Sequence, residues 1–151
     1  SYLDPETNER YLPFVIEPAA GLDRALITVL IDAYDEEEVR GDTRVVLRLD
    51  WKLAPVQVAV MPLSKKEELI EPARRVQRLL QGAFRVEYDQ TGGNIGRRYR
   101  RQDEIGTPFC VTVDFDTLND AAVTIRERDS MEQERVPIEA LVARLRERMP
   151  E

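Results

Sequence analysis

The sequence predicts an α/β fold in which a mixed sheet is flanked by helices. Val56–Met61 is an almost continuous apolar run, which is typical of a strand covered on both faces. Segments with helical spacing separate this run from later alternating segments, and the last two strand-like segments follow one another directly. The order strand, helix, strand, helix, strand, strand, helix predicts parallel and antiparallel pairing in one sheet. A length of 151 residues suits one domain, or one domain with part of another.

Ahead of this sheet, the apolar run Tyr11–Ile16 predicts a strand, and apolar residues at helical spacing predict a helix over Gly21–Tyr34. Only Arg24, Thr28 and Asp32 form a polar stripe on this helix, so it needs cover on most of its sides. A chain of this length can hardly cover such a helix and also build a second core. The pattern therefore indicates a missing partner or domain.

The acidic segment Asp35–Asp42 contains few apolar residues, which indicates a solvated loop or linker, whereas Thr43–Leu49 fits either a strand or a helix. Within the sheet-forming part, Pro72 suits the first turn of a helix. The predicted elements of that part are a helix with Ala73, Val76 and Leu80 on one face, a half-buried strand at Phe84–Tyr88, a helix at Asn94–Ile105, strands at Phe109–Phe115 and Val123–Glu127, and a helix that begins at Pro137 and presents Ile138, Leu141, Val142 and Leu145 on one face.

Composition and charge exclude several kinds of site. Asp and Glu number 29 against 22 Lys and Arg, and the net charge of -7 by itself argues against a nucleic-acid binder. The absence of histidine excludes Ser-His and Cys-His catalysis and His-ligated metals. The single cysteine, Cys110, cannot form an internal disulfide, which suits a reducing cytoplasm. No apolar run approaches the ~20 residues of a membrane span, and the start of the chain, which has no signal pattern and no initiator Met, predicts a piece of a longer protein.

The densest group of cations is the segment Gly96–Arg101, in which four arginines surround a tyrosine. It follows the glycine-rich turn Thr91–Asn94, and turn amides next to a helix N-terminus make an anion site. The arginines would add phosphate contacts, and the tyrosine would add a stacking surface for an unpaired base. An ordinary basic helix face paired with Asp103 and Glu104 explains the same residues about equally well. A P-loop is excluded, because no Gly-Lys-Ser/Thr closes the turn.

The segment Glu17–Arg24 places a carboxylate at a strand end, just before a helix that bears an arginine. In an active cleft, Glu17 would bind a substrate amine and Arg24 a phosphate. Taken alone, the segment is more simply a helix-capping turn with a structural ion pair.

Several segments resemble the class II aminoacyl-tRNA synthetases, and specifically their dimeric glycyl type. Glu17–Arg24 looks like motif 3 of that class, and Ala54–Leu63 resembles the first strand of the class IIa anticodon-binding domain. Gly93–Phe109 is similar to the most distinctive stretch of the glycyl family, and Val111–Thr117 and Arg126–Gln133 match the segments that follow it. The resemblance covers nearly the whole chain in the family's order and spacing, and it favours the glycyl type over the threonyl, prolyl and histidyl types.

The resemblance implies that residues 1–50 are the strand-helix end of a class II antiparallel catalytic domain, including motif 3. Glycine would be bound by Glu17, through its amino group, together with Ala19 and Gly21. Ala19 stands where the family usually has serine, which removes a hydroxyl contact worth about 0.5–1.5 kcal/mol. ATP would contact Gly21, Leu22, Asp23 and Arg24, with Arg24 on its phosphates. Motifs 1 and 2 are absent from the sequence, so ATP and Mg are expected only in the full-length homodimeric enzyme and this chain alone is expected to be inactive in adenylation.

The resemblance further implies that residues 51–151 are a class IIa anticodon-binding domain, which binds the anticodon arm of the glycine tRNA from about Leu53 onward. Phosphate or stacking contacts would come from Arg97, Arg98, Arg100 and Arg101. Base edges would be read by Asp103, Glu104, Arg126 and Arg128, because carboxylates accept from cytosine and arginines donate to guanine. The implied partners are this tRNA, glycine and ATP, with no bound metal and no membrane.

Two alternatives compete with a ligase. A free-standing, non-catalytic accessory protein with the anticodon-binding fold would bind RNA, but it has no reason to keep the Glu17–Arg24 motif. A plain α/β interaction domain would leave the arginines unused. The net charge does not decide between them, because the acids crowd Glu36–Glu38 while the arginines gather at Arg97–Arg101, and the local field determines where a phosphate docks.

Overall fold

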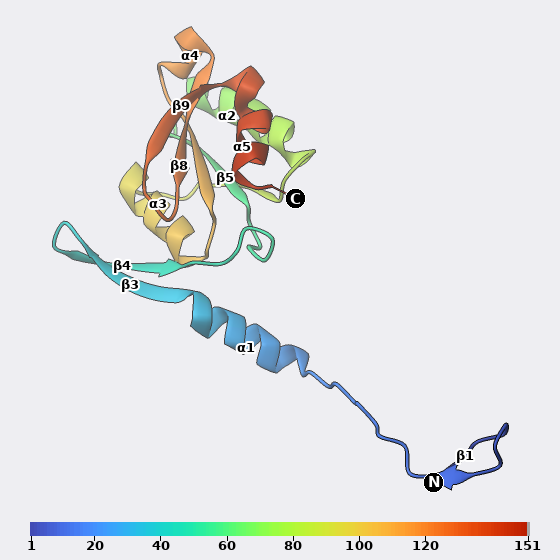
Figure 1. Cartoon of the computed structure of the whole chain (residues 1–151). Coiled ribbons are helices and arrows are strands. Elements are labelled where there is room, and N and C mark those ends of the chain that lie inside the picture. Colours follow the sequence, from blue (N-terminus) through green and yellow to red (C-terminus); the bar gives the residue numbers. More distant parts are fainter. Residues whose placement is uncertain (151) are drawn as a thin grey trace.

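A five-stranded mixed sheet with helices on both faces forms the body of the molecule (Figure 1). The computed structural model describes residues 1–150. The strand order is β6-β5-β7-β8-β9, in which β5 pairs in parallel with β6 and β7, and β8 pairs antiparallel with β7 and β9. The predicted mixed sheet is therefore confirmed. Its elements are β5 (Val58–Pro62), α2 (Glu67–Gln81), β6 (Val86–Tyr88), α3 (Ile95–Glu104), β7 (Phe109–Val113), α4 (Thr117–Asp120), β8 (Ala122–Glu127), β9 (Gln133–Pro137), a 3-10 turn η1 (Ile138–Ala140) and α5 (Leu141–Arg148).

The two faces of the sheet carry separate cores. Every residue of β5 and β7 is buried, as expected of strands covered on both sides. Side chains of α2 and α5 pack on one face, where Val76, Leu80, Leu141 and Leu145 join the larger cluster. On the other face Tyr99 of α3 packs with side chains of β5 and β7. Helices α2 and α3 thus lie on opposite faces of the sheet.

Helix α2 begins earlier than the sequence indicates. It starts at Glu67, so Pro72 lies inside the helix and not in its first turn. Two acidic residues, Glu67 and Glu68, occupy the first turn, where the positive end of the helix dipole favours them. The apolar face predicted for this helix is confirmed, because Ala73, Val76 and Leu80 are all buried.

The acidic segment predicted as a loop is a strand. Strand β3 (Tyr34–Val39) forms an antiparallel hairpin with β4 (Asp42–Leu47), which also settles the open choice for Thr43–Leu49 in favour of a strand. The register places Glu37 opposite Arg44, so the acids of one strand face arginines of the next. We refer to β3 and β4 as the β3–β4 hairpin. It packs against α3 through β4 (Figure 1).

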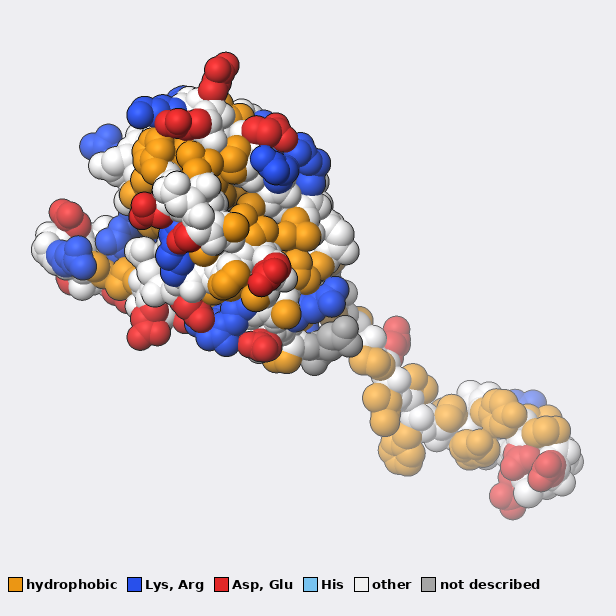
Figure 2. All heavy atoms as spheres, turned by 90° about the horizontal axis from the view of Figure 1, so that it is seen from above, with side chains coloured by type: hydrophobic (Ala, Val, Ile, Leu, Met, Phe, Trp, Pro, Cys, Tyr) orange, Lys and Arg blue, Asp and Glu red, His pale blue; other side chains and the backbone are white. Residues whose placement is uncertain are grey.

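The first part of the chain extends away from the sheet. Strands β1 (Tyr2–Leu3) and β2 (Arg10–Tyr11) pair with each other, and residues 12–21 have no regular structure. The strand predicted over Tyr11–Ile16 is therefore wrong beyond Tyr11, because no strand of residues 1–150 lies beside this run to accept its hydrogen bonds. Figure 2 shows apolar side chains gathered along this extension.

Helix α1 (Leu22–Ala33) forms as predicted, and its apolar sides are uncovered. Leu22 is 83% exposed and Ile31 is 71% exposed, whereas Ala33 is the only buried residue of the helix. The need for cover inferred from the sequence is thus visible in the fold. None of the helices in residues 1–150 combines the length and apolar character that a membrane span requires.

The sequence-based prediction lacks strand β9 and the close contact made by the turn after α3. Strand β9, at the sheet edge, carries mostly exposed or half-buried polar residues and lacks a clear apolar alternation. The turn after α3 depends on Gly106, whose φ is +83°. A Cβ at Gly106 would lie 2.9 Å from Leu49 Cδ1 and 3.0 Å from the Leu47 carbonyl oxygen. Only glycine allows the end of the hairpin to approach α3 this closely.

Candidate functional site

The arginine-rich helix α3 begins with a side-chain cap. The Asn94 side chain accepts a hydrogen bond from the Arg97 backbone N–H at 2.9 Å, and Gly93 precedes it with a φ of +112°. This is the glycine-rich turn that the sequence placed ahead of the cation cluster. The helix then presents different arginines to different surroundings, because successive residues are rotated by about 100° around the axis.

Arg98 points into the protein and is used structurally. Its Nε lies 3.0 Å from Asp89 Oδ2, and it donates to the backbone carbonyls of Pro62 and Asp89. Burial raises the pKa of the Asp89 carboxyl, but hydrogen bonds from Thr91 and Arg98 outweigh it and hold that pKa below 3.8. Arg98 therefore fixes the loop after β6 to the end of β5, and only 3% of the residue is exposed.

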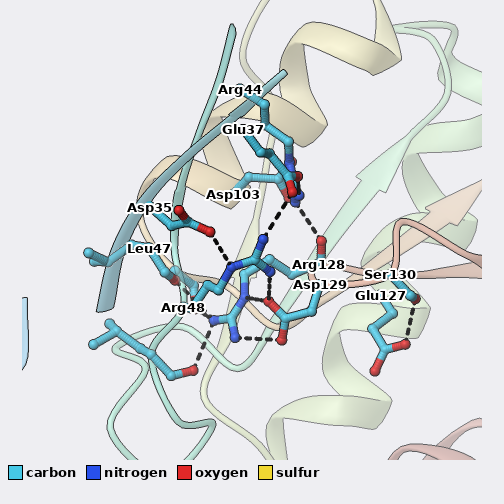
Figure 3. A network of polar contacts seen from close by, with 12 residues as sticks. Asp35, Glu37, Arg44, Leu47, Arg48, Asp103, Glu127, Arg128, Asp129 and Ser130 are labelled. Carbon is cyan, nitrogen blue, oxygen red and sulfur yellow. Dashed lines mark hydrogen bonds and ion pairs between the residues drawn. The ribbon is translucent and has the colours of Figure 1, made fainter. Parts of the chain in front are cut away.

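Asp103, on the same inner side of α3, is completely buried between two arginines. It accepts from Arg126 Nη1 at 2.8 Å and Nη2 at 3.0 Å, and from Arg44 Nε at 3.0 Å. Arg44 also donates to Glu37 and to the Arg128 carbonyl. Burial opposes the charge of Arg44, yet its hydrogen bonds with Asp103 and Glu37 raise its pKa. We call these residues the Asp103 network; it joins the hairpin, α3 and β8. Figure 3 shows Arg44, Glu37 and Asp103 close together.

Arg128 caps backbone carbonyls at the junction of the hairpin and the sheet. Its Nη1 donates to the carbonyls of Leu47, Leu49 and Gly106 at 3.1, 2.9 and 2.9 Å. Its other nitrogens pair with Asp129, which also binds Arg48 of the chain segment after β4 (Figure 3). Arg128 is thus a structural residue whose donors are consumed within the protein.

The structure narrows the set of residues predicted to touch RNA. Arg98, Asp103, Arg126 and Arg128 are each at most 5% exposed and already paired, so they are positioned to hold elements together. The residues of that set that reach the surface of α3 are Arg97, Arg100, Arg101 and Glu104, of which Arg100 and Arg101 are half-buried. The inner face of α3 is thus engaged in structural pairs, and contact of its outer face with RNA stays a prediction.

A hollow that the sequence did not indicate lies where β5 and β6 end. Its volume is about 310 Å³, and Pro62 and Tyr88 mark the carboxyl ends of the two strands. The Arg74 guanidinium carbon lies 3.6 Å from the centre of the Tyr88 ring, and Lys65 and Gln90 line the same space. The chain leaves these two strands toward α2 and α3, which lie on opposite faces of the sheet. We call this space the strand-end hollow.

The sequence contains two residues that could have pointed to this hollow, but their signal is weak. Lys65 follows a buried strand and Tyr88 closes a half-buried one, so both lie at strand ends. Arg74, however, reaches the hollow from α2, and its approach to Tyr88 depends on how the helix crosses the sheet. Local sequence does not contain that crossing geometry.

The residues predicted to bind glycine and ATP are not assembled into a pocket by residues 1–150. Glu17, Ala19 and Gly21 lie in the extended segment before α1, and all are exposed. Glu17 and Arg24 form no ion pair with any residue that the structure describes, so the ion pair of the simpler interpretation is not observed. The other predicted ATP contacts, Leu22 and Asp23, are exposed on the first turn of α1.

No group of three or more histidine, cysteine, aspartate or glutamate side chains is placed to hold a metal ion within residues 1–150. The single cysteine, Cys110, is buried in β7, and burial raises the pKa of its thiol to about 12. A thiol with that pKa stays protonated and is a poor nucleophile at neutral pH.

Comparison with known proteins identifies relatives of the chain. Residues 57–148 match the family described as "Anticodon binding domain". Over 146 residues the chain is 64% identical to a protein of Corynebacterium efficiens named "Glycine--tRNA ligase", which covers 93% of this chain and 32% of that protein. A protein of Clostridium acetobutylicum with the same name is 59% identical over 150 residues, covering 99% of this chain and 32% of that protein. The predicted resemblance to the glycyl type is confirmed.

The fold is also found among solved structures. Prolyl-tRNA synthetase from Cryptosporidium parvum, solved with halofuginone and AMPPNP, superposes with a TM-score of 0.64 at 28% identity, covering 68% of this chain and 22% of that one. The chain thus spans about a third of the length of the curated relatives it matches.

Proposed function

Because this chain belongs to the anticodon-binding domain family, we propose that its sheet and helices, from about Leu53 onward, bind the anticodon arm of the glycine tRNA. One observation supports this most directly. Three cationic side chains, Lys65, Arg74 and the buried Arg98 of α3, line a hollow at the ends of β5 and β6 in which Arg74 stacks on Tyr88. Cations for phosphates and planar groups for unpaired bases are the two components that single-stranded RNA recognition requires.

The two components have separate roles in this proposal. Arg97 and Arg101, one helical turn apart on the outer face of α3, contact phosphates and position the loop without reading sequence. The strand-end hollow receives an unpaired base, which stacks against the Arg74–Tyr88 pair while Gln90 donates and accepts at its edge. Glu104, exposed on α3, is placed to accept from a cytosine amino group.

The net charge of -7 does not oppose RNA binding in this arrangement. Asp35 and Glu37 of β3 are paired with Arg44 and Arg48, so the field of these two acids is compensated locally. Three arginines, Arg97, Arg100 and Arg101, reach the surface of α3 beside one acid, Glu104, while Asp103 is directed inward, so cations predominate on this surface.

We further propose that the chain acts as part of a glycine–tRNA ligase, which attaches glycine through an ATP-dependent glycyl-adenylate. In that enzyme Glu17 binds the glycine amino group beside Ala19 and Gly21. ATP, with Mg, contacts Gly21, Leu22, Asp23 and Arg24. The identity to ligases over most of the chain and the uncovered apolar sides of α1 support this proposal, since such a helix packs inside a larger domain. A cytoplasmic homodimer is the expected assembly.

The test of anticodon binding measures discrimination between RNAs. The chain is titrated with fluorescent glycine tRNA and with the same tRNA carrying a replaced anticodon. We expect tighter binding to the first, because base contacts contribute about 1–3 kcal/mol each. Arg74→Met removes the planar cation while keeping the aliphatic stem, so it lowers discrimination. Arg75→Met, an exposed neighbour on α2, is the matched control. Equal binding of the two tRNAs by the wild-type chain contradicts anticodon reading.

A further inference from the structure

A second, smaller hollow lies on the α3 face of the sheet, between the tip of the β3–β4 hairpin, α3 and the turn from β8 to β9. Its volume is about 230 Å³. Arg40 lines it from the hairpin, Tyr99 and Arg100 line it from α3, and Arg126 lines it from β8. We call it the tip hollow. It is distinct from the strand-end hollow, with which it shares no lining residue.

The charges around the tip hollow are unbalanced. No carboxylate lines it, whereas three guanidinium groups do. Of these three, Arg126 is held by Asp103 at 2.8 Å and lies 4.8 Å from the centre of the Tyr99 ring. Both oxygens of Asp103 already accept hydrogen bonds from Arg44 and Arg126, so this carboxylate has little capacity left for further cations.

Two of the three arginines keep unused donors. Nη1 of Arg100 is inaccessible to solvent and has no hydrogen-bond partner, and its nearest carboxylate oxygen, Asp103 Oδ2, is 4.0 Å away. The Arg40 side chain forms no hydrogen bond or ion pair with any residue of the described range 1–150. A buried donor without a partner costs about 1–3 kcal/mol unless something accepts from it. Since the Arg100 side chain is 35% exposed although Nη1 is closed to solvent, an anion in the hollow accepts from this donor once the side chain turns.

The backbone at this place is also held in an unusual conformation. Only four non-glycine residues within the described residues 1–150 have a positive φ, and two of them, Arg40 at +55° and Met131 at +59°, line the tip hollow. At Arg40 this is the geometry of the two-residue hairpin turn, in which Arg40 and Gly41 both have a positive φ. The conformation of Arg40 sets the direction of its side chain at the hairpin tip.

We propose that the tip hollow binds a phosphodiester group of the RNA that the domain recognises, with Arg40 and Arg100 donating to its oxygens. This rests on the proposed function, and it adds a contact from the hairpin, outside the segment expected to bind RNA. Planar guanidinium groups match phosphate oxygens in a two-pronged geometry. Arg100 lies at the edge of the exposed face of α3. The RNA backbone can therefore run along the surface of α3 from Arg97 and Arg101 to the tip hollow.

The test compares Arg40→Ala with Arg146→Ala, an exposed arginine on α5, which packs on the other face of the sheet. The full chain is titrated with an anticodon stem-loop of the glycine tRNA between 0.1 and 1 M salt. One lost phosphate contact makes the slope of log affinity against log salt shallower by about 0.7 for a single strand and by about 0.9 for a duplex. The affinity of Arg40→Ala relative to that of the wild type is therefore about five- to eightfold lower at 0.1 M salt than at 1 M salt. Arg146→Ala keeps the wild-type slope.

A second measurement identifies the group that is bound. Stem-loops with a single uncharged methylphosphonate at successive positions are titrated against both proteins. One position weakens binding to the wild type and has no further effect on Arg40→Ala, because the contact is already missing. In a separate titration, inorganic phosphate is added to the protein at low ionic strength, and NMR follows the shifts of the arginine Nε–H signals. Shifts at Arg100 with free phosphate but no methylphosphonate-sensitive position mean that the hollow takes a free anion, and they overturn the RNA contact.

The two proposals fail differently in this design. If the wild type binds the stem-loop and Arg40→Ala matches its affinity and salt slope, the tip hollow is not a phosphate site, while RNA binding by the domain stands. If the wild type binds no stem-loop even at low salt, both proposals are overturned.

Discussion

Asp103 is the residue on which the joining of three elements depends. It is fully buried, and it accepts hydrogen bonds from Arg44 of the hairpin and from Arg126 of β8. A buried ion pair adds little net stability over apolar residues of equal volume, because both charges lose their hydration. Removing one member of such a pair strongly destabilises the fold, because the remaining charge stays buried without compensation. In the folded chain the residue therefore positions α3, and its role as a reader of bases stays a prediction.

We expect Asp103→Ala to lower the free energy of unfolding by about 3–5 kcal/mol, because Arg126 is left buried without a carboxylate partner and Arg44 keeps only Glu37. Asp103→Asn keeps the volume and is expected to be destabilising as well, because the amide cannot neutralise two guanidinium groups. Urea unfolding followed by circular dichroism measures both variants.

The control for this prediction is Glu104→Gln, the exposed neighbour on the same helix, which should stay within about 0.5 kcal/mol of wild type. Equal stabilities for Asp103→Ala and Glu104→Gln would show that the Asp103 network does not hold the elements together.

At the scale of elements, the β3–β4 hairpin connects the two parts of the chain. The sequence predicts a boundary between residues 50 and 51, and that boundary stays a prediction. The structure adds that contacts cross it: Arg44 reaches Asp103, and Arg128 caps the carbonyls of Leu47 and Leu49. The hairpin thus shares its buried polar groups with the sheet domain, whatever domain its sequence descends from.

Truncation tests this connection. We expect a chain that starts at residue 34 to unfold at a higher temperature than one that starts at residue 51. The shorter chain leaves Asp103 with one arginine and exposes donors of Arg128 that the hairpin carbonyls now accept. Calorimetry of the two chains measures the difference. A shorter chain that is as stable as the longer one would show that the hairpin is only an attached ribbon.

The elements that the sequence predicted well are those whose signal is local. Helix α2 carries its buried face in its own spacing, and the continuous apolar run of β5 reports burial on both faces. Strand β3 was missed because a run of acids is typical of a solvated loop. In the fold, Arg44 pairs with Glu37 and Arg48, just after β4, pairs with Asp35. The strand predicted at Tyr11–Ile16 fails for the opposite reason, since apolar content alone does not supply a neighbouring strand.

At the scale of the whole molecule, acidic side chains are bound to arginines at many places. Asp35, Asp89, Asp114, Asp120 and Asp129 all have a pKa below the ordinary 3.8. For Asp35 and Asp120 the main cause is a hydrogen bond with an arginine; for the other three, burial raises the pKa but hydrogen bonds outweigh it. The negative net charge is thus largely neutralised in local pairs.

These lowered pKa values predict acid lability. A carboxyl whose pKa is lower in the folded than in the unfolded state stabilises the fold above the unfolded value and loses this contribution as the pH falls through the folded one. We therefore expect the free energy of unfolding to drop steeply below pH 3.8. Urea titrations between pH 7 and pH 2.5 measure this decline. Asp89→Asn should show a shallower decline, and exposed Asp23→Asn should follow the wild type. Identical declines in all three proteins would exclude Asp89 from this coupling.

The sequence by itself determined the mixed α/β sheet, the arginine helix after its glycine turn, and the resemblance to glycyl-type synthetases, because each depends on periodicity or on ordered local motifs. Only the tertiary structure decided which charges are available to a ligand. Arg98 and Arg101 are close neighbours on one helix, yet Asp89 holds the first in the interior while the second borders solvent. The physical reason is that burial and pairing depend on side chains distant in sequence, such as Arg44 at Asp103 and Arg74 at Tyr88, and only the packed fold brings them together.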